Sequence, residues 1–166
     1  MGTPPNSFSA NTKIQSAQVN ANFNAMSDGT GWSTSAITLG YAQITGNLTT
    51  TSASQVQATG LTSTVTIPAG GRKVKVSAYF WGVGSTVAAT LTVFIWDGVI
   101  GSGTQLQGWN STATASGVIA GACLIQAIVT PSAGSKTYNI GIATTGGTGT
   151  FYCGSTTPAF LLVELI

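Results

Sequence analysis

The sequence predicts a mainly β protein: an antiparallel, jelly-roll-like β-sandwich head, preceded by an extended arm and one short α-helix. From Leu61 onward, short runs of alternating apolar and polar residues follow one another, separated by Gly- and Pro-containing turns. About eight such runs occur, at the spacing typical of a β-sandwich or jelly roll. Charged residues make up only 5% of the chain while hydrophobic residues make up 43%. This composition favours a folded protein that packs against other subunits over a freely soluble monomer.

The chain divides into three segments. Residues 1–30 form an anchoring arm with the short helix, residues 31–60 a linker, and residues 61–166 the sandwich head. The linker assignment rests on an abundance of Gly, Ser and Thr with few strong apolar runs. Within it, a short strand or an extended piece is expected over residues 36–41 and 42–48.

Pro4 and Pro5 bias the first ten residues toward an extended conformation. A capping box from Thr12 to Gln15 then predicts a helix over residues 13–26, which ends before Asp28-Gly29. A helix this short is marginal alone in water, so its apolar side chains need a surface to pack on. That surface is either the protein's own domain or a docking partner. The side chains expected to make this contact are Ile14, Val19, Phe23 and Met26.

Two long apolar strands are predicted within residues 72–97, with Gly82, Gly84 and Ser85 between them as the turn of a hairpin. Each strand places aliphatic side chains on one face. The other face, which water normally covers in a sandwich, also carries large aromatic side chains. We therefore expect another chain or a ligand to cover it. The aromatic residues of this expected subunit interface are Tyr79, Trp81, Phe94 and Trp96.

Further strands are expected over residues 61–67, 104–109, 118–130, 135–144, 150–153 and 159–166. The last of these is apolar on both faces except at Glu164, which indicates a central strand or one at a subunit interface. A buried Glu164 needs a cationic partner, and Lys73 or Lys75 of the same or another subunit are candidates. Glu164 is therefore included in the expected interface.

The residue inventory argues against an enzyme. The chain has no His, which excludes a Ser-His-Asp or Cys-His arrangement within it. A glycosidase pair would have to be Asp97 with Glu164, yet Asp97 begins a turn and Glu164 lies in an apolar strand. The cysteines, Cys123 and Cys153, fit no metal-binding spacing and are expected to be buried thiols, although the sequence leaves their pairing open. We expect no catalytic residue, metal or cofactor.

Nucleic acid and membrane are not expected as partners. The formal net charge is only +2, and the longest apolar stretch, residues 117–129, is too short to cross a bilayer. The N-terminal residues lack the pattern of a signal peptide. Aromatic side chains provide flat apolar surfaces for sugars, although the core or a subunit interface is favoured for each because aromatic residues are enriched in both. The aromatic candidates for glycan contact are Trp32, Tyr41, Trp81, Trp96, Trp109 and Tyr152.

Several stretches resemble the tail-fibre and virion-appendage proteins of bacteriophages. They are IQSAQVNANFN at residues 14–24, GYAQIT at 40–45, PAGGR at 68–72 and LLVE at 161–164. The resemblance implies a homotrimer with jelly-roll C-terminal heads, made in the host cytoplasm and fixed to phage capsid or tail proteins by its N-terminal segment. The absence of a long repetitive shaft favours a compact decoration, with head or tail attachment left open. The alternative is a module of a tail fibre that binds bacterial surface glycan.

Overall fold

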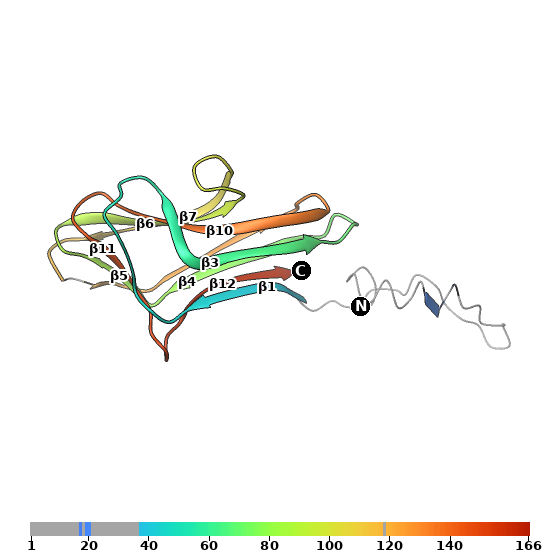
Figure 1. Ribbon diagram of the computed structural model, residues 1–166, viewed down its shortest axis with the longest axis horizontal. Coiled ribbons are helices and arrows are strands. Elements are labelled where there is room, and N and C mark those ends of the chain that lie inside the picture. The colour runs from blue at the N-terminus through green and yellow to red at the C-terminus, as the bar shows by residue number, and fades with distance from the viewer. Residues whose placement is uncertain (1–16, 18, 21–36, 118) are drawn as a thin grey trace.

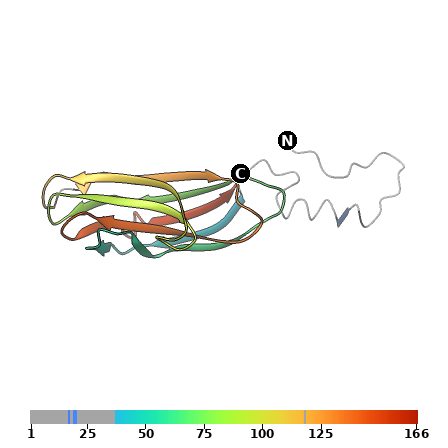
Figure 2. The same cartoon turned by 90° about the horizontal axis from the view of Figure 1, so that it is seen from above.

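The computed structural model describes residues 17, 19–20, 37–117 and 119–166 as a β-sandwich with its strands running lengthwise (Figures 1 and 2). The strands are β1 (Ile37–Ile44), β2 (Leu48–Thr50), β3 (Val56–Ile67), β4 (Val74–Phe80), β5 (Gly82–Ser85), β6 (Ala89–Asp97), β7 (Thr104–Ala113), β8 (Ile119–Ala120), β9 (Cys123–Val129), β10 (Gly134–Thr144), β11 (Gly149–Tyr152) and β12 (Ala159–Leu165).

Two four-stranded antiparallel sheets form the layers, in the orders β1-β12-β4-β9 and β3-β10-β6-β7. A smaller sheet, β2-β11-β5-β8, lies toward the end of the sandwich where β5 and β11 are labelled (Figure 1). The inward side chains of the layers make one hydrophobic core, in which Phe80, Tyr138 and Leu161 are fully buried. The predicted antiparallel, jelly-roll-like fold is therefore confirmed.

The sandwich begins at Ile37, not at Leu61, so the prediction of a linker over residues 31–60 is wrong for residues 37–60. β1 pairs along its length with β12, β2 pairs with β11, and β3 starts at Val56. The alternating pattern of β1 is weak because this strand lies at a sheet edge and most of its side chains are only half-buried. Gly and Thr dilute the pattern further, which makes such a strand look like a linker.

The predicted hairpin between the two long apolar strands is also wrong. β4 pairs with β12 and β9 in one sheet, whereas β6 pairs with β10 and β7 in the other. Gly82–Ser85 is not a turn but the buried strand β5, which pairs with β11. Alternation shows that a segment is a strand but does not select its neighbour, which is decided by long-range packing.

β12 lies between β1 and β4, which confirms that the last strand is central. Leu161 and Val163 point into the core, whereas Phe160 and Leu162 lie half-buried on the outer side of the sheet. The two-sided apolar pattern of β12 follows from this position.

In the N-terminal segment, Ala17, Val19 and Asn20 are helical. The rest of the helix predicted over residues 13–26 lies outside the described residues, as do Ile14, Phe23, Met26 and the arm. Within the described part of the chain, no helix has the length and hydropathy needed to cross a membrane.

Candidate functional site

One outer surface of the sandwich carries a continuous stripe of large apolar side chains. Phe160 of β12 lies opposite Tyr79 of β4, and Tyr79 lies opposite Leu124 of β9. The rings of Tyr79 and Phe160 stack with centroids 5.6 Å apart, and Tyr41 packs against Phe160 at 6.1 Å. The apolar face, as we call this outer side of sheet β1-β12-β4-β9, carries the apolar side chains of Tyr41, Tyr79, Leu124, Ile128, Phe160 and Leu162. Between Leu124 and Ile128 lies one polar pair, in which the amide Nε2 of Gln126 donates to Oγ of Ser77 at 3.2 Å.

Much of the apolar face is open to solvent in a single chain. Tyr41 is 52% exposed, Leu124 is 58% exposed and Ile128 is 60% exposed. Contiguous exposed patches of this kind commonly mark interaction sites.

Glu164 and Lys75 neutralise each other beside the apolar residues. They are register partners on β12 and β4, and their side chains form an ion pair at 2.7 Å. Of the two lysines expected from the sequence, the partner is Lys75, and it belongs to the same subunit. The pair adds no net charge to the apolar face.

The outer side of sheet β3-β10-β6-β7 also carries aromatic residues, but the chain covers them itself. The ring of Phe94 lies against Gly108 on β7, and the indole of Trp96 lies over Gly141 on β10 beside Gln55. Trp96 is only 9% exposed and Phe94 is half-buried. Neighbouring glycines leave space for both rings, so the chain itself shields Trp96 almost fully and Phe94 in part. They lie on the opposite layer from Tyr79 and do not share a surface with it.

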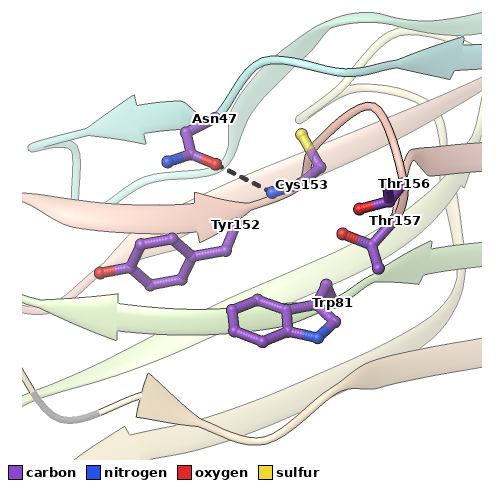
Figure 3. A pocket seen from close by; sticks show the side chains of 6 residues that line it. All are labelled: Asn47, Trp81, Tyr152, Cys153, Thr156 and Thr157. Carbon is purple, nitrogen blue, oxygen red and sulfur yellow. Dashed lines mark hydrogen bonds between the residues drawn. The ribbon is translucent and has the colours of Figure 1, made fainter.

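Trp81 belongs to a different feature, a pocket of about 350 Å³ that we call the end pocket (Figure 3). Trp81 follows β4 and is 45% exposed; its indole meets the Tyr152 ring edge-on, with centroids 6.3 Å apart. The end pocket is lined by Asn47, Trp81, Tyr152, Cys153, Thr156 and Thr157.

Hydrogen bonds donated by backbone N–H groups hold the walls of the end pocket together. The Cys153 N–H donates to Oδ1 of Asn47 at 2.9 Å, and the Trp81 N–H donates to the carbonyl of Tyr152 at 3.2 Å (Figure 3 draws the first). Gly154 and Thr157 exchange two backbone hydrogen bonds, of 3.0 and 3.2 Å, which close a tight turn. Three chain segments that are distant in sequence are thereby fixed around one hollow.

The sequence singled out Trp81 and Tyr152 as aromatic candidates but missed Asn47, Thr156 and Thr157. These three residues carry no distinctive motif, and only the pairing of β1 with β12 and of β2 with β11 brings them together. Of the other aromatic candidates, Trp96 is buried, Trp109 packs against the core, Tyr41 lies on the apolar face, and Trp32 lies outside the described residues.

The two cysteines are free thiols, which answers the question that the sequence left open. Burial raises the pKa of Cys123 to about 12, and burial also raises the pKa of Cys153. Burial, and secondarily the nearby Asp97 carboxylate, raises the pKa of Tyr138 to about 12. A raised thiol pKa leaves little thiolate at neutral pH, so neither cysteine is primed as a nucleophile.

The two described carboxylates, Asp97 and Glu164, lie in different sheets. Each has a lysine partner: Nζ of Lys136 is 3.7 Å from Asp97, and Lys75 pairs with Glu164. Among the described residues, no three His, Cys, Asp or Glu side chains gather in a group that would hold a metal ion.

No family model and no curated protein matches the chain. Among solved structures, the tumour necrosis factor Eiger of S. frugiperda aligns at 12% identity and a TM-score of 0.43, covering 78% of this chain and 94% of Eiger. A chain of infectious bursal disease virus, Gx strain, aligns at 13% identity and a TM-score of 0.37, with coverage of 79% and 36%. The enzymatically active domain of tailspike protein 4 from bacteriophage CBA120 aligns at 15% identity and a TM-score of 0.28, with coverage of 76% and 19%. This chain thus spans much less than two thirds of the latter two proteins.

Proposed function

We propose that the protein is a structural, non-enzymatic component of a bacteriophage virion. It forms a homotrimeric fibre or decoration attached to the head or tail, with the β-sandwich as its exposed head. The observation that carries the proposal is the apolar face, with Leu124 58% and Ile128 60% exposed in a single chain. The resemblance of residues 14–24 and 40–45 to phage tail-fibre and appendage proteins supports the virion assignment and the trimer.

The apolar face suits contact with copies of the same chain. Its ion pair, between Lys75 and Glu164, closes within one subunit, so the face brings no net charge to a contact with another subunit. A closed symmetric oligomer is the ordinary way to cover such a face on every subunit. The opposite layer makes a poor second interface because its outer side presents exposed Thr62, Thr64 and Thr66 and covers its own aromatics.

Attachment to capsid or tail proteins is assigned to the N-terminal segment. Ile14, Val19, Phe23 and Met26 are the side chains proposed to make that contact, on the basis of the amphipathic pattern and the resemblance. In this arrangement the virion holds the segment before β1 and the sandwich projects from it.

The subunit contact is tested by sedimentation of the full chain. We expect the native protein to sediment at three times the mass of one chain, and Leu124→Lys to lower this mass because a lysine would be buried without a partner. Thr66→Lys adds the same charge to an exposed position on the opposite layer and serves as the matched control. A monomeric native protein, or a Leu124→Lys variant that assembles fully, would contradict the trimer.

Attachment is tested on gradient-purified phage particles that carry Phe23→Asp in this chain. We expect the variant protein to be trimeric but missing from the particles by mass spectrometry. Particles that retain it in full would contradict the N-terminal contact. If the unmodified protein is absent from purified particles, the virion assignment itself fails.

A further inference from the structure

We propose that the end pocket is a binding site for a neutral sugar, taking one terminal pyranose of a glycan. The end pocket takes no part in the proposed subunit contact or in the N-terminal attachment, so a ligand there does not depend on the trimer. Three properties of the end pocket support a sugar ligand: an exposed aromatic wall, a fixed polar rim and the absence of formal charge among its lining residues.

The aromatic wall suits the apolar side of a sugar ring. A pyranose presents C–H groups on its faces and hydroxyls around its edge, so a flat ring can stack on it without stripping the hydroxyls of hydrogen bonds. Trp81 is 45% exposed, and the Tyr152 ring supports its indole edge-on at an interplanar angle of 89°. This contact restrains one edge of the indole, which lowers the entropy cost of ordering Trp81 on binding.

The rim supplies hydrogen-bonding groups at fixed positions. Oδ1 of Asn47 accepts the N–H of Cys153, which sets the amide orientation and leaves Nδ2 as a donor. The hydroxyls of Thr156 and Thr157 point toward the centre of the pocket (Figure 3). These groups donate and accept, as sugar hydroxyls do, and the turn closed by Gly154 and Thr157 holds the two threonines in place.

The chemistry of the lining selects the class of ligand. The six lining residues carry no formal charge, so nothing in the wall compensates the carboxylate of an acidic sugar or the charge of an amine. The volume of about 350 Å³ lies at the small end of the roughly 300–1,000 Å³ range of ligand pockets. A single neutral sugar unit at a chain end fits these limits.

The position of the pocket suits a ligand presented from outside. In the β1–β12 pair, Ile37 lies opposite Leu165 at one end, and Ile44 lies opposite Ala159 at the other. The end pocket lies beyond the second end, because Asn47 follows β1 and Thr156 and Thr157 precede β12. It is therefore remote from Ile37, where the chain enters the sandwich.

The test is saturation-transfer NMR on the full chain with methyl pyranosides of glucose, galactose, mannose and N-acetylglucosamine, and with methyl glucuronide as the acidic probe. We expect saturation transfer to at least one neutral glycoside and at least tenfold less to the glucuronide. Trp81→Ala should reduce the transfer at least tenfold, and Trp81→Phe, which keeps a ring face, should retain part of it. Thr157→Val should weaken binding severalfold, whereas Thr66→Val, an exposed threonine on β3, should not change it.

The thermal midpoints of all variants are measured alongside, so that loss of binding is separated from loss of fold. No transfer to any neutral glycoside, equal transfer in Trp81→Ala, or a preference for the glucuronide would each overturn the proposal. Each of these results leaves the sedimentation of the native protein unchanged. Failure of the sugar site is therefore distinguishable from failure of the trimer.

Discussion

The ring of Phe94 lies against the backbone of Gly108, its register partner on β7, in the space that a Cβ at Gly108 would occupy. This relationship covers an aromatic side chain on the outside of the sandwich without a second chain. The two layers differ in this respect. On the other layer, Tyr41, Phe160 and Tyr79 pack side by side, and Tyr41 remains open to solvent.

Gly108→Ala is expected to lower the free energy of unfolding by about 1–3 kcal/mol, because the new methyl group collides with the Phe94 ring and forces it off the sheet. Chemical denaturation checks this. Gly46→Ala is the control: a Cβ at Gly46 meets nothing within 4 Å, so the change should stay within about 0.5 kcal/mol. Equal stabilities of the two variants would show that Phe94 does not occupy this position.

The stability of the protein is expected to fall as the pH rises above about 10. Tyr138 is fully buried and its pKa is raised from 10.0 to about 12, so the folded state keeps the phenol proton when the unfolded state has lost it. The stabilisation is complete below pH 10 and is lost as the pH rises through 12, with a slope of at most about 1.4 kcal/mol per pH unit from this group.

Tyr138→Phe isolates that contribution. The variant should show a shallower loss of stability between pH 10 and 12 than the native chain, in parallel urea titrations. At pH 7 it should differ by no more than about 1 kcal/mol, because the Tyr138 hydroxyl has no hydrogen-bond partner within the described part of the chain. Identical pH profiles would mean that the phenol is not shielded in solution.

The ion pair between Lys75 and Glu164 is expected to contribute modestly to stability. A double-mutant cycle with Lys75→Gln and Glu164→Gln should give a coupling of about 0.5–1 kcal/mol, since both side chains remain partly exposed. The pair of Lys136 with Asp97, separated by 3.7 Å, provides a matched cycle with a smaller expected coupling. The larger coupling should shrink in high salt. A coupling below that of Lys136 with Asp97 would contradict the 2.7 Å contact.

The two thiols should react at different rates with iodoacetamide at pH 8, followed by mass spectrometry of peptides. Cys153 is only half-buried and should label first, whereas Cys123 is fully buried and should label only when denaturant is added. The raised pKa of each thiol makes both slower than a free cysteine. Quantitative recovery of a disulfide from the native protein would contradict the free thiols.

Sequence reasoning located most strands of the head because their alternation is local. Residues 135–144 and 159–166 were expected as strands and correspond closely to β10 and β12. It failed at β1, whose position at the edge of a sheet weakens the alternation. It also failed for β4 and β6, which look like a hairpin but belong to different sheets.

The candidate surfaces were predictable only in part. The sequence indicated that Tyr79, Trp81, Phe94 and Trp96 sit on outward faces, but alternation alone does not reveal what lies beneath a side chain. The Phe94 ring lies over Gly108 and the Trp96 indole lies over Gly141. Tyr79 stacks on Phe160, and Trp81 lines the end pocket. Register between strands distant in sequence decides each of these outcomes.

The sequence by itself determined that this is a β protein with few charged residues and with apolar residues on both sides of its strands, because side-chain alternation and composition are properties of short segments. Only the tertiary structure decided which outward aromatics remain exposed and which six residues form a pocket. Those properties depend on strand order and register, which arise from packing the two sheets around one core and leave no local trace in the chain.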